Sequence, residues 1–263
     1  NLLCLPPDNF PLSDEDINQE NFEVSSQKLL RLLNKTKISI SNDETRHYLN
    51  GIYFHKIKLE NKSFLCGVAT DSHRLSSSNL EIDPSINIEP IILPKKTIFQ
   101  LISLLEQNSG EIKISSNKSK IKFEIGNSVL ISKVIDGRFP DYSKVIPKDN
   151  DKVLQMKLDE FRNSIERVTT VSSDRKEGLK MAISKDSVQL SVNNPSSGEG
   201  IENINAKFNS NDLNISFNSR YLTDIASQIE NEYIIINLKD AGSPVLINDF
   251  SDKNSFHVVM PMK

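Results

Sequence analysis

The sequence predicts an α+β protein in which one domain plan occurs twice, each copy with two helices packed on antiparallel β-sheets. Two observations predict this fold class. Each half of the chain has two segments with the apolar spacing of amphipathic helices, and short runs that alternate apolar and polar residues accompany them in the same order. A length of 263 residues also suffices for about two domains.

The predicted domains are residues 21–147 and 148–263, preceded by a segment of different composition. Residues 1–20 contain five acidic side chains, no lysine or arginine, and three prolines. We expect this segment to be a linker or the end of a preceding domain. The chain starts at Asn1, with no methionine and no basic region before an apolar stretch, so we expect a fragment without a secretory signal.

Four helices are expected, two in each copy. The first follows a short strand at residues 22–24, is capped by Ser25 or Ser26, and contains four leucines between positions 29 and 33. The second spans residues 95–106. The third follows a strand at residues 154–156 and carries an apolar stripe at positions 158, 161, 165 and 168. The fourth spans residues 219–229.

The β-rich parts of the two copies match in order. Strands are expected at residues 52–54, 64–70, 111–115, 120–125 and 128–133, and again at residues 181–183, 188–192, 233–238, 244–248 and 256–260. Residues 193–200 are rich in Asn, Ser and Gly, and we expect a flexible loop there.

The composition excludes several classes of protein. A net charge of −3 and a pI near 5.9 exclude a globally basic nucleic-acid coat, although a local basic face remains possible. Two cysteines cannot form a disulfide framework. No apolar run is long enough for a membrane helix. The sequence has no phosphate-binding glycine loop, no dinucleotide-binding glycine pattern and no zinc-ligand spacing, so we expect no cofactor and no metal.

The helices carry basic or hydroxyl-rich faces. Lys28, Arg31 and Lys35 follow one another at helical spacing, and the second and fourth helices present Lys96 and Arg220 among Gln, Ser and Thr. Such a surface can contact a phosphate backbone without reading bases. An ordinary solvated helix face gives the same pattern, and the third helix mixes its arginines with acidic residues.

One polar cluster invites a catalytic interpretation. Asp71, Ser72 and His73 follow a predicted strand, and a hydrolase would need them in a nucleophile–base geometry. Neighbouring residues of an extended chain point to opposite faces, and no Gly-x-Ser-x-Gly elbow is present. The alternative is a loop in which Asp71 caps backbone amides and Arg74 pairs with an acid. We therefore expect a binding or scaffolding protein rather than an enzyme.

Five segments resemble the bacterial DNA sliding clamp family, the β subunit of DNA polymerase III. Residues 68–75 resemble its Val-Ala-Thr-Asp-Gly-His-Arg-Leu signature, with Ser72 in place of the glycine, and residues 46–51 resemble its Arg-Tyr-Tyr-Leu-Asn-Gly stretch. Residues 137–147 resemble the segment between its second and third domains. Residues 217–222 and the ending at residues 258–263 complete the match, in family order along nearly all of the chain.

The resemblance implies a fold and a function. Members form a ring of two head-to-tail subunits, each with three copies of one α+β domain, whose helices line a hole for duplex DNA. Residues 1–20 then resemble the end of the first domain, so this chain alone is not expected to close a ring. The clamp catalyses no reaction, and it tethers the polymerase III catalytic subunit, the clamp loader and other proteins that carry a clamp-binding motif. A cytoplasmic, nucleoid-associated homodimer without membrane contact is implied.

The resemblance also implies two sets of site residues. The basic residues proposed to face DNA are Lys28, Arg31, Lys35, Lys95, Lys96, Arg162, Arg167 and Arg220. The groove for partner peptides is implied at Leu49, Thr70, His73, Arg74, Leu75, Pro140, Lys144, Val145, Asn218, Tyr221, Val258, Val259, Met260, Pro261 and Met262.

Two departures from the family bear on that groove. Ser72 would alter the loop if its position needs φ > 0, and Lys176 lies where some members have an aromatic residue. The chain also stops at Lys263, where members often carry one further apolar residue. Two other hypotheses remain open: a duplicated binding module unrelated to DNA, and the hydrolase at Asp71, Ser72 and His73.

Overall fold

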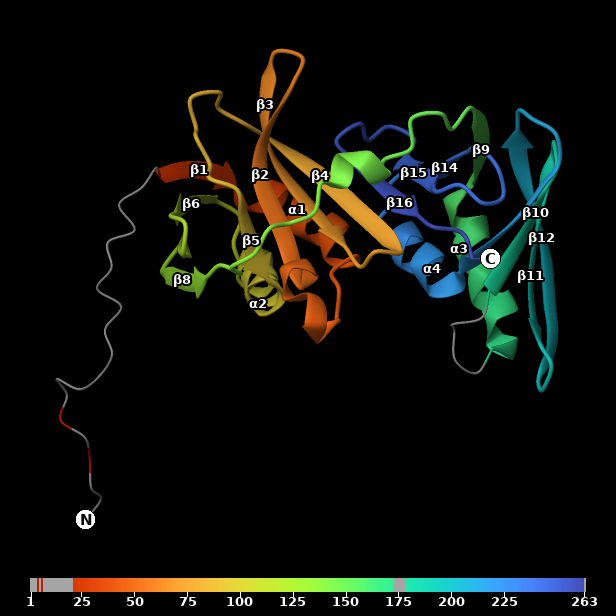
Figure 1. Ribbon diagram of the computed structural model, residues 1–263, viewed down its shortest axis with the longest axis horizontal. Helices are drawn as coiled ribbons and strands as arrows, with labels where there is room; N and C mark the ends of the chain where they lie inside the picture. Colours follow the sequence, from red (N-terminus) through yellow and green to blue (C-terminus); the bar gives the residue numbers. More distant parts are fainter. Residues whose placement is uncertain (1–3, 5, 7–20, 173–177, 263) are drawn as a thin grey trace.

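The structure is a computed structural model that describes residues 4, 6, 21–172 and 178–262. Its two halves lie side by side along the long axis of the molecule (Figure 1). The predictions for residues 1–20, Lys176 and Lys263 concern positions outside these ranges, apart from Cys4 and Pro6.

The first half contains two helices, α1 and α2, and strands β1 to β8. Their bounds are β1 Asn21–Ser25, α1 Ser26–Lys37, β2 Gly51–Leu59, β3 Lys62–Thr70, β4 Arg74–Ile82, β5 Ile91–Pro94, α2 Lys95–Glu106, β6 Glu111–Ser116, β7 Lys120–Ile125 and β8 Ser128–Lys133. Two short 3₁₀ helices, η2 Glu44–Leu49 and η3 Tyr142–Val145, lie in the connections.

The second half repeats this order with helices α3 and α4 and strands β9 to β16. Their bounds are β9 Lys152–Lys157, α3 Leu158–Val168, η4 Thr169–Val171, β10 Gly178–Ile183, β11 Ser187–Asn194, β12 Gly198–Phe208, β13 Leu213–Asn218, α4 Ser219–Ala226, β14 Tyr233–Leu238, β15 Val245–Asp249 and β16 Ser255–Val259.

The sheet topology confirms the predicted duplication. The first half has strand orders β1-β6-β7-β8 and β4-β3-β2-β5, and the second half has the same orders, β9-β14-β15-β16 and β12-β11-β10-β13. All of the named strand pairs are antiparallel, as predicted. β4 of the first half pairs with β16 of the second, so one twelve-stranded sheet crosses the junction.

Each half has its own hydrophobic core between helices and sheets. Leu29, Leu32 and Leu33 of α1 are buried with Phe123 and Leu101 in the first core. The apolar stripe of α3 is buried in the second core, which closes over Phe217 and Ile225. A third, smaller cluster lies at the junction, with Leu49, Leu75 and Val258 among its members. This third cluster determines the shape of the site described below.

The predicted helices are present, with one difference in length. α4 ends at Ala226 and not at residue 229, because the following turn tightens: the N–H groups of Gln228 and Ile229 donate to the carbonyls of Ile225 and Ala226, three residues back. α4 begins where the Asn218 side chain accepts a hydrogen bond from the backbone N–H of Arg220 at 3.0 Å.

The sequence predictions missed four strands and misassigned one loop. β4, β5, β12 and β13 were not predicted as strands. Ser76, Ser77 and Ser78 interrupt the apolar pattern of β4, yet their side chains are buried. Residues 193–200 are not a flexible loop: they form a hairpin in which β11 runs to Asn194 and β12 starts at Gly198, which has a φ of 106°.

Candidate functional site

The predicted groove residues meet where β4 begins and β16 ends. In their antiparallel pairing, Leu75 lies opposite Val258, and Arg74 lies opposite Val259. Because neighbouring residues of a strand point to opposite faces, Leu75 and Val258 share the outer face of the sheet, whereas Arg74 and Val259 share the helix side. The candidate groove therefore surrounds the ends of two strands.

The outer-face part of the groove has an apolar floor. Leu49, Leu75 and Val258 expose only 2%, 2% and 3% of their surfaces and belong to one buried cluster. Thr70 lies opposite Leu75 on β3, and its hydroxyl donates a hydrogen bond to the carbonyl of Arg74 at 2.7 Å. These residues lie buried beneath the candidate groove and support it from within.

One wall of this part comes from the segment between the two halves. Phe139 stacks on Tyr53 with ring centroids 4.9 Å apart, and the hydroxyl of Tyr142 lies 3.0 Å from Nε2 of His55. The segment is thereby held against the sheet, while the groove residues on it, Pro140, Lys144 and Val145, stay exposed. Lys144 extends into solvent and pairs with Asp141 at 3.4 Å.

Burial changes the titration of the groups under this wall. It lowers the pKa of His55 to about 4, so the imidazole is neutral at pH 7. It also raises the pKa of Tyr142, so the phenol keeps its proton. The Tyr142–His55 contact is therefore a hydrogen bond between two neutral groups.

Arg74 organises the helix-side part of the groove. Its guanidinium pairs with Asp71 at 3.1 Å and with Asp224 of α4 at 2.7 Å, and it lies over the ring of Tyr221 at 4.3 Å from the centroid. Arg74 is 9% exposed, and its partners Asp71 and Asp224 are partly exposed. A guanidinium held between two carboxylates and an aromatic ring has a fixed orientation.

The C-terminal tail joins the two parts. The N–H of Met260 donates to the carbonyl of His73 at 2.9 Å, and the N–H of Met262 donates to the carbonyl of Ser216 at 2.7 Å. Both methionine side chains are exposed, at 42% and 40%, and Pro261 lies between them. A tail fixed through its backbone leaves two adaptable apolar side chains available to a partner.

Val259 is a wrong assignment. Its side chain is fully buried in the core of the second half, because it points to the helix side of the strand while Val258 points outward. The family motif includes Val259, but side chains alternate between the two faces of a strand, so Val258 reaches the groove and Val259 does not.

The loop at residues 71–73 is a capped turn. The carboxylate of Asp71 accepts hydrogen bonds from the backbone N–H groups of His73 and Arg74 at 3.0 and 2.9 Å. Ser72 has a φ of +78°, and its hydroxyl accepts a hydrogen bond from Arg46 at 2.6 Å. The family glycine position thus does use a left-handed backbone, and Arg46 holds the serine that replaces it.

This geometry favours the second interpretation of the cluster. Asp71 is committed to backbone amides and to Arg74, and the Ser72 hydroxyl is bonded to Arg46. A nucleophile needs a hydrogen bond to its base, and these contacts commit the Asp71 and Ser72 side chains to the turn instead.

The predicted DNA-facing residues separate into two groups. Lys28, Lys96 and Arg220 are exposed on α1, α2 and α4. Lys95 is half-buried and bonded to Asn42. Arg167 is 57% exposed but forms a two-pronged ion pair with Glu202 on β12, at 2.8 and 3.1 Å.

The remaining cations are engaged inside the protein. The prediction for Lys35 is wrong, because its side chain is 2% exposed and its ammonium contacts the carbonyl of Gln228. Arg31 pairs with Glu230 and Asp252, and Arg162 donates to backbone carbonyls at the end of α4. Burial lowers the pKa of Lys35, although Glu230 opposes this.

Sequence reasoning missed the acids that bind these cations. Asp224 is 150 positions from Arg74, and Glu230 is 199 positions from Arg31. Local helical spacing contains no information on such partners, and only the fold brings them together.

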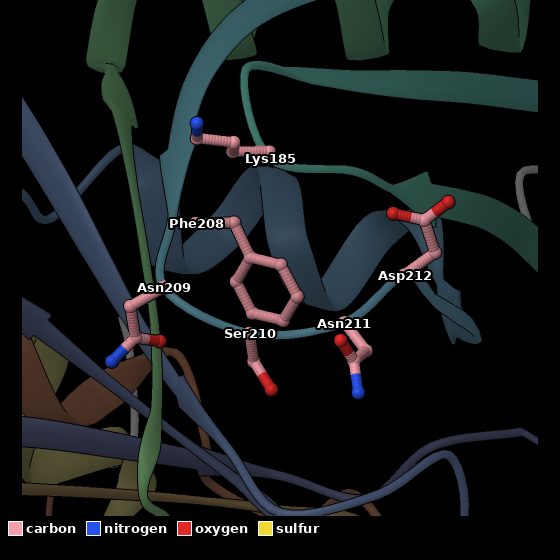
Figure 2. A pocket seen from close by; sticks show the side chains of 6 residues that line it. All are labelled: Lys185, Phe208, Asn209, Ser210, Asn211 and Asp212. Carbon is pink, nitrogen blue, oxygen red and sulfur yellow. The ribbon is translucent and has the colours of Figure 1, made fainter.

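Two hollows outside the groove differ in character. A cleft of about 800 Å³ lies between α3 and α4, where Arg162 and Arg220 line it with Glu166, Asp224 and several hydroxyl groups. The hollow in Figure 2 lies at the turns beside Phe208, and its polar side chains do not converge on one point. Within the described ranges, no cluster of potential metal ligands is found and no helix could cross a membrane.

Comparison with known families matches nearly the whole chain. Residues 23–141 match the family described as the DNA polymerase III beta subunit, central domain, and residues 143–263 match the family described as the DNA polymerase III beta subunit, C-terminal domain. The beta sliding clamp of Caulobacter vibrioides is 35% identical over 264 residues, covering 100% of this chain and 71% of that relative. The Pseudomonas aeruginosa protein of the same name is 32% identical, with the same coverage.

Solved structures agree with these matches. A sliding clamp from Bartonella birtlesii bound to griselimycin superposes with a TM-score of 0.93 at 40% identity, covering 99% of this chain and 70% of that one. A Caulobacter crescentus clamp, with polyethylene glycol bound to a region described as a putative β-motif tethering region, gives a TM-score of 0.95 at 35% identity. It covers 98% of this chain and 69% of the other.

Proposed function

The chain belongs to the bacterial sliding clamp family, the β subunit of DNA polymerase III, and from this membership we propose that it encircles duplex DNA in a head-to-tail dimeric ring and tethers replication proteins. It acts in DNA replication as a sliding clamp. The gain from tethering is effective concentration, because a held partner rebinds before it diffuses away. We propose a non-catalytic role in the cytoplasm at the nucleoid, and a domain boundary between Pro147 and Lys148.

The junction between the two halves supports the ring. β4 joins β16 edge to edge there, and the repeated topology makes β12 the counterpart of β4 and β8 the counterpart of β16. Both counterparts carry exposed apolar side chains: Val129 and Ile131 on β8, and Ile201 on β12. Exposed apolar strand edges favour pairing with a further strand. We propose that β8 and β12 continue the ring in the way that β4 and β16 continue the sheet.

The helix layer supports sequence-independent contact with DNA. Lys28, Lys96 and Arg220 are exposed cations on three helices, with Gln, Ser and Thr beside them. Such contacts neutralise phosphates without reading bases, so they permit sliding. We propose these three as the principal DNA-facing residues, with Lys95, Arg162 and Arg167 in supporting positions.

The groove at the junction supports the tethering role, and it is the observation that carries the proposal. Segments from both halves assemble one surface with an apolar floor, an orienting Arg74–Tyr221 pair and two exposed methionines. Hydrophobic anchors and a few polar groups are what a short linear peptide needs for docking. We propose that the polymerase III catalytic subunit, the clamp loader and other clamp-binding proteins dock there.

The encircling role is tested by topology in the full-length protein. The clamp is loaded on a nicked DNA circle, and its retention is measured before and after the circle is cut. We expect retention on the circle and rapid loss from the linear form, because a ring slides off free ends. Replacing Lys28, Lys96 and Arg220 with glutamate should reduce loading, and the matched exposed Lys58→Glu variant should not. Equal retention on circular and linear DNA would contradict encirclement.

A further inference from the structure

The cations of α1 that do not face solvent lie at the junction between the two halves. Arg31 donates from Nε and Nη2 to both carboxylate oxygens of Glu230, at 3.0 to 3.2 Å, and from Nη2 to Asp252 at 2.6 Å. Lys35 donates to the carbonyl of Gln228 and lies 3.4 Å from Glu230. Arg31 and Lys35 belong to the first half, and their partners belong to the second half.

The acids of this cluster are themselves held in place. Asp252 accepts hydrogen bonds from Ser255 and from the N–H of Asn254, and it is only 7% exposed in its side chain. The N–H of Glu230 donates to Asp249 at 2.8 Å. Two positive side chains therefore face three carboxylates, those of Glu230, Asp249 and Asp252, in a geometrically fixed group with little net attraction for phosphate.

A second polar contact crosses the same junction deeper in the molecule. The hydroxyl of Ser39, directly after α1, lies 2.7 Å from the hydroxyl of Ser76 on β4, which lies 2.8 Å from Nδ1 of His257 on β16. All three side chains are buried. The junction is thus joined at the sheet by the β4–β16 ladder and at the helix layer by α1.

We propose that Arg31, Lys35, Glu230 and Asp252 form an electrostatic lock that fixes the angle between the two halves. The β4–β16 ladder, the apolar cluster at the junction and the Arg74–Asp224 ion pair join the two halves near the groove. The lock adds an attachment at α1, outside the plane of the sheet, and its rupture would leave the buried Lys35 ammonium and the buried Asp252 carboxylate without their opposite charges. Arg31 and Lys35 are positioning residues, and the groove that spans the junction depends on them for its width.

The lock is tested by the distribution of distances between spin labels on the two halves of this chain. Cysteines at the exposed positions Lys118 and Asn211 carry the labels. Cys4 is exposed and is replaced with serine, whereas Cys66 is buried and stays unlabelled. The test variant is Glu230→Gln with Asp252→Asn, and its matched control neutralises the exposed acids Glu89 and Asp186.

We expect the test variant to widen the distance distribution about twofold and the control to leave it unchanged. An unchanged width in a folded test variant would overturn the lock. Should the double variant fail to fold, Glu230→Gln alone decides the matter, because that side chain is 54% exposed and its replacement is mild.

DNA binding by the full-length protein distinguishes the lock from a DNA-contact role. If Arg31 and Lys35 contact phosphates, neutralising their acids frees them, raises the affinity for DNA and steepens its salt dependence. The lock predicts that any gain in affinity is accompanied by widening of the distance distribution. A gain, without widening of the distance distribution, would return both residues to the DNA-facing set.

Discussion

The groove and the helix face differ in how their predicted residues are arranged. Most groove residues, drawn from five segments of the sequence, gather at one place around the ends of β4 and β16. The predicted basic residues of the helix face divide, with Lys28, Lys96 and Arg220 exposed and Lys35 buried. A family motif predicts where a residue lies in the fold. A charge pattern on a helix predicts only that a residue is polar, and it does not predict whether the side chain faces solvent.

The two regions also differ in how much their residues contribute to the stability of the fold. Leu49, Leu75 and Val258 beneath the proposed groove belong to a buried cluster, so they contribute to stability. Exposed lysines on α1 and α2 have few contacts to lose.

Leu75→Ala should have the largest effect on stability. Leu75 is 2% exposed in the groove floor, and removing a buried leucine side chain costs about 3 kcal/mol in free energy of unfolding. Urea unfolding monitored by circular dichroism measures this. Lys96→Ala on the helix face is the control and should change the free energy by less than about 0.5 kcal/mol. Equal losses in free energy of unfolding for the two variants would contradict the proposed difference between the groove and the helix face.

His257 should make the junction sensitive to acid. Burial lowers its pKa to about 3 in the folded protein, against about 6.5 in the unfolded chain. Between these two pKa values, His257 is protonated in the unfolded chain and neutral in the folded protein. The free energy of unfolding that the neutral, buried His257 contributes is therefore complete above pH 6.5 and is lost as the pH falls towards 3. When the pH is lowered from 6.5 to 4.5, the free energy of unfolding of His257→Gln should fall by about 2 kcal/mol less than that of the parent. Parallel pH profiles would show that His257 does not titrate differently on folding.

The two classes of cation should differ in the salt dependence of DNA binding by the full-length protein. Lys96→Gln should reduce the slope of log affinity against log salt by about 1, because one phosphate contact is lost. Arg31→Gln should leave the slope nearly unchanged, since Glu230 and Asp252 already hold that charge. A larger change for Arg31 than for Lys96 would reverse the assignment.

Ser72→Gly should give the smallest effect. A left-handed backbone is strained for serine and relaxed for glycine, but the bond from Arg46 is lost. We expect a net gain of about 0.5 kcal/mol in free energy of unfolding, measured by urea unfolding. A loss of about 1 kcal/mol would indicate that the Arg46–Ser72 hydrogen bond outweighs the strain.

Helices and regular strands were the most predictable parts of the fold. The bounds of α2, β7, β8 and β14 follow directly from apolar periodicity. β4 was missed because three consecutive serines read as a loop, although they are buried against the partner half. β12 was missed because its outward face is polar and its start lies in a glycine-rich turn. β4 lies at the junction and β12 at the corresponding edge of the second half. At such positions, strands distant in sequence determine which side chains are buried.

The site was predictable in position and less so in chemistry. The resemblance located Arg74, Leu75 and Tyr221, and the loop interpretation expected an acid beside Arg74, but Asp224 as a partner of Arg74 follows only from the fold. The burial of Lys35 likewise depends on Gln228 and Glu230, which no local pattern connects to α1.

Docking of partner peptides in the groove at the junction is tested by fluorescence polarisation of a labelled clamp-binding peptide rich in Gln and Leu. We expect saturable binding to this chain in about the micromolar range. The double variant Arg74→Ala with Met260→Ala should abolish it, and the exposed helix-face variant Lys28→Ala should retain it. Absence of binding to the folded chain, or equal loss in both variants, would contradict the account.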